Sequence, residues 1–188
     1  YGSQLLVCRH SIIGKGIYKN VRHGVDFSGG SDLICWKNNS SYVDSAVGSA
    51  AYTMGHGLRS RRIKCIDNYS LNFPVGVVAG NPAFEVDHYV DTINNTSVGA
   101  TATAAIFYTS GGTERATGGF ISGNTLIGTT ESCISATDID DIDISGNKCF
   151  GTTASTRGMI NLFTCVRASI SNNKVHDSSA EGILLATC

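Results

Sequence analysis

Apolar and polar residues alternate along short stretches of this chain, and no stretch carries the apolar stripe of a helix. Ile142 and Ile144 show the alternation, as do Ile160 and Leu162. A period of two predicts short β-strands whose apolar side chains share one face. Ser, Thr, Gly and Asn fill the gaps between these stretches, and turns favour these residues. The pattern therefore predicts an all-β fold of short strands joined by tight corners.

A repeat runs through the chain. Three related segments, at residues 121–128, 144–151 and 170–177, read ISGNTLIG, ISGNKCFG and ISNNKVHD. Counting back from their asparagines at similar intervals finds one asparagine in each of six repeats, at Asn39, Asn68, Asn95, Asn124, Asn147 and Asn173. Repeats of this length are typical of solenoids, in which each unit packs on the next. Three short strands per repeat predict a right-handed parallel β-helix of about seven coils, forming one domain over residues 1–188.

The asparagine column has a structural explanation. Asparagine tolerates the left-handed backbone conformation that a tight corner requires. Stacked asparagine side chains can also hydrogen-bond from one coil to the next. Neither explanation requires a functional role for the column. The last apolar strand has no polar cap, and the chain starts in the middle of the repeat pattern. We therefore expect both ends to continue into further chain or into partner subunits.

Composition excludes several classes of function. Hydrophobic residues make up 41% of the 188 residues, charged residues 15%, and the net charge is −1. This balance supports a packed core, and it offers no cationic excess for binding nucleic acid. No apolar run approaches the roughly 18 residues of a membrane span, so we predict no membrane insertion. We also predict no cofactor and no metal, because no motif for either is present.

The seven cysteines are scattered and form no C-x-x-C motif. This pattern fits buried, reduced thiols that pack as small apolar side chains. It predicts synthesis in a reducing cytoplasm. If Ile160 aligns with Ile183, Cys165 and Cys188 stack in neighbouring coils, and we still expect both to be thiols.

The repeated segments resemble those of the pectate-lyase-like β-helix superfamily, and most closely those of bacteriophage tailspikes and tail fibres. The resemblance implies a homotrimer in a virion tail or another extracellular setting. It also implies that the chain binds, and as an enzyme depolymerises, a bacterial surface polysaccharide by hydrolysis or elimination. The alternatives are a non-catalytic structural or receptor-binding fibre and a non-viral polysaccharide lyase or epimerase. A fold does not by itself locate a site.

The first candidate site combines acids, histidines and arginines in the N-terminal half. A step of about 28 residues would bring together basic and acidic segments of neighbouring coils. The candidate catalytic residues are Glu85, Asp87, His56 and His88. The candidate substrate-binding residues are Arg59, Arg61 and Trp36, with Asp32 expected close to Arg61. Tyr52, Tyr89 and Tyr108 are further aromatic candidates for contacting a sugar.

The second candidate site is the acidic segment at residues 137–143, with Asp138, Asp140, Asp141 and Asp143. Alignment of the isoleucines of the repeat places Asp138 beside Arg115 and Asp141 beside Arg167. We therefore interpret the segment first as an exposed charge ladder. Calcium binding and catalysis are the alternatives that we retain for these second-tier acids.

Overall fold

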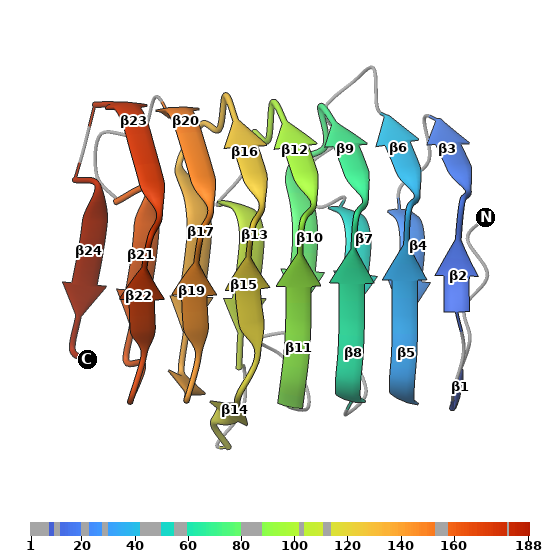
Figure 1. Cartoon of the computed structure of the whole chain (residues 1–188), viewed down its shortest axis with the longest axis horizontal. Coiled ribbons are helices and arrows are strands. Elements are labelled where there is room, and N and C mark those ends of the chain that lie inside the picture. Colours follow the sequence, from blue (N-terminus) through green and yellow to red (C-terminus); the bar gives the residue numbers. More distant parts are fainter. Residues whose placement is uncertain are drawn as a thin grey trace.

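The computed structural model describes residues 8–9, 12–19, 23–27, 30–41, 50–54, 60–79, 88–101, 104–110, 114–152, 158–179 and 181–188. Every regular element within these ranges is a β-strand. The strands form three parallel sheets that run along one axis, as Figure 1 shows. The prediction of an all-β parallel solenoid is therefore confirmed.

We name the three long sheets A, B and C. Sheet A contains β1 (Cys8–Arg9), β2 (Ile12–Gly14), β5 (Gly30–Trp36), β8 (Ser60–Ile66), β11 (His88–Ile93), β15 (Phe120–Ser122), β19 (Asp143–Ser145) and β22 (Ser169–Ser171). Sheet B contains β3 (Ile17–Lys19), β6 (Asn39–Ser41), β9 (Tyr69–Leu71), β12 (Thr96–Val98), β16 (Thr125–Ile127), β20 (Lys148–Thr152) and β23 (Lys174–Ser178). Sheet C contains β4 (His23–Phe27), β7 (Ala50–Met54), β10 (Val75–Ala79), β13 (Ala104–Thr109), β17 (Ser132–Thr137), β21 (Ile160–Phe163) and β24 (Ile183–Ala186).

The chain visits the sheets in the order A, B, C and then begins the next coil. Two short strands, β14 (Ala116–Thr117) and β18 (Ile139–Asp140), pair at an additional corner. The sequence predicts about seven coils. The described residues make up about five turns, and the sheets to which they contribute are seven or eight strands deep.

The core lies between the three sheets and consists of inward columns of apolar side chains. Ile121, Ile144 and Ile170 are partners on neighbouring strands of sheet A, as the repeat predicts. Ile160 and Ile183 are partners in sheet C. Residues on either side of an inward position point outward, because successive side chains of a strand alternate between its faces. The outer face of each sheet is therefore determined by the same register as the core.

A ladder of buried asparagines joins the coils between sheets A and B. The backbone N–H of Asn38 donates to Oδ1 of Asn68 (2.9 Å), and Nδ2 of Asn38 donates to the same oxygen (3.0 Å). The Asn68–Asn95, Asn95–Asn124, Asn124–Asn147 and Asn147–Asn173 steps repeat both bonds. Each amide also donates to a backbone carbonyl of the preceding coil, as Asn68 does to Cys35 (3.0 Å). The column thus satisfies backbone groups that a buried corner would otherwise leave unpaired.

Two details of the predicted ladder are wrong. Its member in the second coil is Asn38, which is buried, whereas Asn39 is exposed. The ladder asparagines are also not the residues in the left-handed conformation. That conformation belongs to the residue before each of them, such as Asp67 (φ 55°) and Gly123 (φ 66°). The asparagine is therefore needed for its side-chain amide rather than for its backbone freedom.

The described cysteine side chains are free thiols, and Cys188 is the one that is exposed. Cys35 and Cys65 are partners in sheet A, and each accepts a hydrogen bond from the ladder amide three residues later in its own coil. Burial raises the pKa of the Cys165 thiol to about 11. Cys165 and Cys188 remain separate thiols in neighbouring coils. The side chain of Cys8 lies outside the described residues.

The ladder predicts different effects on stability for substitutions at the adjacent residues Asn38 and Asn39. Replacing Asn38 by Ala leaves the N–H of Gly16 without its side-chain acceptor, and the carbonyl of Ile13 loses its donor. An unsatisfied buried polar group costs about 1–3 kcal/mol. We expect Asn38→Ala to lower the free energy of unfolding by at least about this amount, measured by urea denaturation.

Asn39→Ala is the matched control for this variant. Its side chain is exposed and lies outside the ladder, so we expect a change within about 0.5 kcal/mol. Equal effects of the two substitutions would contradict the register described above.

Candidate functional site

The structure describes part of the first candidate site. His56, Arg59, Glu85 and Asp87 lie outside the described residues. Arg61 and His88 are partners on β8 and β11, so the predicted approach of these two neighbouring coils is present.

The expected position of Asp32 is wrong by one residue. Ser31 is the partner of Arg61 on the neighbouring strand. Asp32 instead forms an ion pair with Arg62, at 2.5 Å between Nε and Oδ1. Asp32 is therefore paired with Arg62, the next arginine along β8, and not with Arg61 as predicted.

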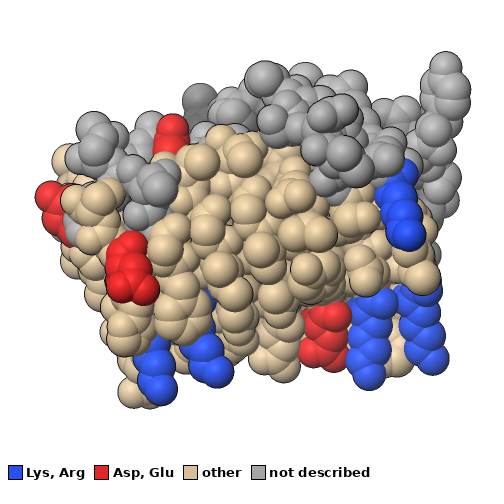
Figure 2. Space-filling view, turned by 90° about the horizontal axis from the view of Figure 1, so that it is seen from above, with Lys and Arg blue, Asp and Glu red and all other residues tan. Residues whose placement is uncertain are grey.

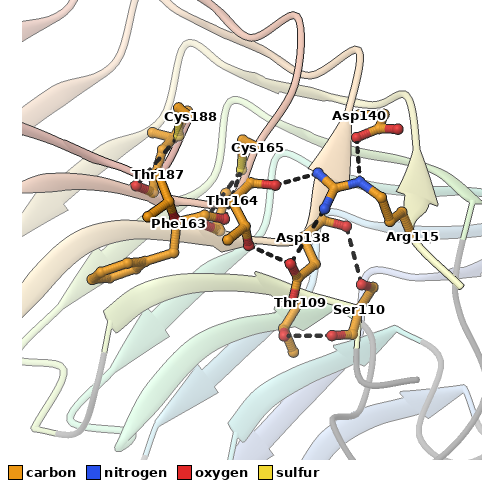
Figure 3. A network of polar contacts seen from close by, with 12 residues as sticks. Thr109, Ser110, Arg115, Asp138, Asp140, Phe163, Thr164, Cys165, Thr187 and Cys188 are labelled. Atoms are coloured by element: carbon orange, nitrogen blue, oxygen red, sulfur yellow. Dashed lines mark hydrogen bonds and ion pairs between the residues drawn. The ribbon is translucent and has the colours of Figure 1, made fainter. Parts of the chain in front are cut away.

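The second candidate site is tied into a structural network around Arg115, shown in Figure 3. Nε of Arg115 donates to Asp140 (2.7 Å) and Nη1 donates to Asp138 (3.4 Å). Its Nη2 donates to the carbonyl of Thr164, whose hydroxyl donates to Asp138. Arg115 thus links its own coil to the next two, and the expected contact between Arg115 and Asp138 is present.

The other acids of this segment have different surroundings. Arg167 binds both carboxylate oxygens of Asp141, at 2.5 and 2.8 Å, as the alignment predicts. These hydrogen bonds lower the pKa of Asp141. Oδ1 of Asp143 is buried and has no hydrogen-bond partner among the described residues. No group of three or more His, Cys, Asp or Glu side chains in the described ranges is arranged to hold a metal ion.

A groove of about 590 Å³ crosses the outer face of sheet A, over β5, β8, β11 and β15. Its lining consists of Asp32, Ile34, Arg62, Lys64, Tyr89, Asp91, Gly119 and Phe120. Seen from above, the molecule has mostly uncharged surface among its described residues, and charged side chains gather toward the edges of that view (Figure 2). The groove, by contrast, combines acids, cations and aromatic rings within four neighbouring strands.

Strand alternation places these side chains outward. Lys64 lies between the buried residues Ile63 and Cys65, and Asp91 lies between Val90 and Thr92, which are also buried. Lys64 and Asp91 are partners on β8 and β11. Their neighbours in the same outward column are Ile34 on one side and Phe120 on the other. Apolar and charged side chains therefore follow one another along the axis of the solenoid.

A second outward column lies two residues earlier, and its residues adopt left-handed backbone conformations. Asp32 has φ 58°, Arg62 has φ 54° and Tyr89 has φ 57°. For a bulky residue such as Tyr89 this conformation is strained. The next residue in the column is Gly118 (φ 73°), where a Cβ would lie 2.5 Å from Cδ1 of Tyr89. Gly118 therefore provides both the backbone conformation and the space that the Tyr89 ring occupies.

The charged groups of the groove form two pairs. Arg62 binds both carboxylate oxygens of Asp32, at 2.5 and 2.8 Å. Lys64 lies 3.9 Å from Asp91. Partial burial raises the pKa of Asp91, although Lys64 and the N–H of Phe120, 3.3 Å from Oδ1, act in the opposite direction. Asp91 is therefore the acid in the groove that releases its proton less readily than an ordinary aspartate.

Exposed aromatic rings lie at one end of the groove. Tyr89 and Phe120 are each 53% exposed, so both rings present apolar surface to solvent. Trp36 lies on the same sheet, two residues beyond Ile34, with the ammonium groups of Lys37 and Lys15 at 4.8 and 5.5 Å from its ring. The other aromatic candidates, Tyr52 and Tyr108, are buried in the core and cannot contact a ligand.

Sequence reasoning missed Lys64, Asp91 and Phe120, although the repeat contains the signal that identifies them. Each lies four residues before a ladder asparagine, and the strand register confirms that they form one column. Counting back from the asparagines, rather than between charged segments, would have brought them together.

Comparisons with protein-family models, with curated proteins and with solved structures found no match. The resemblance to β-helix proteins therefore stands at the level of the fold. None of the described segments forms a helix with the length and apolar character needed to cross a bilayer.

The raised pKa of Asp91 makes a prediction with a definite sign. A carboxyl group whose pKa is higher in the folded state lowers stability as the pH rises from its unfolded pKa through its folded pKa. Asp91→Asn removes this effect, so we expect the variant to gain stability relative to the wild type above that range. Urea denaturation across a pH series measures the difference.

Asp141→Asn is a control of opposite sign. Arg167 lowers the pKa of Asp141, so its contribution to stability is present above the unfolded pKa and is lost as the pH falls through the folded pKa. We expect this variant to lose stability relative to the wild type at neutral pH. Parallel pH profiles for the two variants would contradict the electrostatics described for the groove.

Proposed function

We propose that the groove on sheet A binds a polysaccharide, and that the chain is the carbohydrate-binding β-helix of a protein that engages a bacterial surface polysaccharide. The observation that carries the proposal is that two exposed rings, Tyr89 and Phe120, lie beside two ion pairs in one groove. The proposed setting is the one that the repeat resembles, a homotrimeric spike or fibre in a virion tail.

Stacking is the first contribution to such binding. Aromatic rings present a flat apolar surface, and exposed rings retain it for a ligand. The apolar face of a sugar ring can lie against Tyr89 or Phe120 while its hydroxyl groups remain available on the edge. Trp36 would add a third ring farther along the same face.

Hydrogen bonding to the hydroxyl groups is the second contribution. Asp32 and Asp91 are acceptors, and Arg62 and Lys64 are donors. Acidic and basic residues alternate from strand to strand along the solenoid axis, and neighbouring strands are about 4.8 Å apart. The four strands from β5 to β15 span three such spacings, so the lining extends over about 14 Å. Such a length suits an extended chain of sugars rather than a single one.

Cleavage of the bound polysaccharide is the second candidate function, and Asp91 favours it. Glycoside hydrolysis uses one carboxylic acid to protonate the leaving oxygen and a second carboxylate as base or nucleophile. A raised pKa suits Asp91 to the first role. Asp32 is the second carboxylate of the groove, and Arg62 holds it in place. Binding without cleavage, as in a receptor-binding fibre, is the alternative.

The aromatic pair provides the test of binding. We expect Phe120→Ala and Tyr89→Asn each to weaken polysaccharide binding about two- to tenfold, the equivalent of about 0.5–1.5 kcal/mol per aromatic contact. Asparagine is chosen at position 89 because it tolerates a positive φ. Binding is measured on an array of purified bacterial capsular and O-antigen polysaccharides, followed by calorimetry with those that are retained.

Ile127→Ala is the matched control for these variants. Ile127 is an exposed apolar residue on the outer face of sheet B, 39% accessible, and it lies away from the groove. We expect it to bind as the wild type does. Wild-type affinity in both groove variants, or no retained polysaccharide, would contradict the proposal.

The test of cleavage separates turnover from binding. An acid that acts in the transition state contributes to the rate rather than to ground-state affinity. We therefore expect Asp91→Asn to lower the release of reducing ends by about a hundredfold or more while the polysaccharide remains bound. Undiminished cleavage by this variant would exclude Asp91 as the acid.

A further inference from the structure

The charges in the groove bear on the kind of polysaccharide it accepts. Its charged lining consists of two cations and two acids, so their formal charges cancel. Each cation already has an acid beside it: Arg62 binds Asp32 through two hydrogen bonds, and Lys64 lies 3.9 Å from Asp91. Neither cation is arranged as a free site for an anion.

The order of these residues along the axis strengthens this point. Both cations lie on β8, with Asp32 on β5 on one side and Asp91 on β11 on the other. A carboxylate placed over β8 would therefore lie about one coil spacing, roughly 4.8 Å, from each of the two acids. To bind Arg62 in the bidentate way, it would have to displace Asp32.

Among the described residues, the column of Lys64 and Asp91 supplies no further cation beyond the groove lining. Farther along the column of Lys64 and Asp91, beyond Phe120, the next outward residue is Asp143. At the opposite end the column continues with Ile34 and Ile12. Lys15 and Lys37 lie beside Trp36 and are not part of the groove lining.

We propose that the groove selects an uncharged, hydroxyl-rich stretch of polysaccharide and discriminates against sugars that carry a carboxylate. Paired acids and cations offer donors and acceptors to hydroxyl groups without requiring either pair to separate. An acidic sugar would instead meet two carboxylates at close range. This inference rests on the proposed polysaccharide-binding function and specifies its substrate class.

The experiment uses the same polysaccharide with and without its charge. Alginate and polygalacturonate are each compared with their carboxyl-reduced forms, in which the uronates have become neutral sugars, and with O-antigen polysaccharides that lack acidic sugars. We expect the reduced forms to bind at least about tenfold more tightly than the acidic forms. We also expect the affinity for neutral polysaccharides to change less than about twofold between 50 and 500 mM salt, because no net charge is neutralised on binding.

A groove variant provides the complementary measurement. Asp91→Asn leaves the lining with one unbalanced cation, so we expect it to gain affinity for the acidic forms at low salt and to lose that gain at high salt. Ile127→Ala is the control and should show the selectivity of the wild type.

The outcomes separate the two proposals. Tighter, salt-dependent binding of the acidic forms by the wild-type chain would overturn the selectivity inferred here and leave polysaccharide binding intact. If no polysaccharide on the array or among these probes binds, both proposals fail.

Discussion

The asparagine amide is the contact through which each coil determines the position of the next. Its oxygen accepts two hydrogen bonds from the asparagine of the preceding coil, and its nitrogen donates to a carbonyl of that coil. These groups are buried, where unpaired polar atoms are costly. A shift of register by one residue would break every bond of the ladder at once. The ladder therefore does more than stabilise the corner, because it selects one register for sheets A and B.

The groove is a consequence of that register. Apart from Gly119, its lining residues lie four or six positions before successive ladder asparagines, so the same alignment that closes the ladder brings Lys64 beside Asp91 and Arg62 beside Asp32. The backbone at the second of these columns is left-handed in successive coils, which is uncommon for Asp, Arg and Tyr. The same conformation recurs in this column outside the groove, at Asp141 (φ 59°) and Arg167 (φ 55°), so it belongs to the repeat. At the edge of the groove it presents Tyr89 against Gly118.

The two groups of ion pairs have different roles. Around Arg115, the cation contacts two carboxylates and a carbonyl and links neighbouring coils, so its donors serve the fold. In the groove, each cation has one acid partner, and exposed aromatic rings and free volume lie beside it. The same types of residue thus hold neighbouring coils together around Arg115 and form a polar surface for a ligand in the groove. The groove ion pairs differ from the Arg115 network because open space lies beside them.

The sequence by itself determined the fold class and the C-terminal alignment. Alternation and the repeat predict a parallel β-solenoid, and the closely similar segments after residue 120 are enough to pair Arg115 with Asp138 and Arg167 with Asp141. Only the tertiary structure decided the alignment of the earlier coils, where the ladder begins at Asn38 rather than Asn39. That single residue also moves the partner of Asp32 from Arg61 to Arg62. Because side chains alternate between the two faces of a strand, a slip of one residue exchanges the core face for the outer face. The residues that line the groove therefore depend on whether Asn38 or Asn39 joins the ladder. The irregular spacing of the repeats left that choice open in the sequence, and the hydrogen bonds of the ladder decide it.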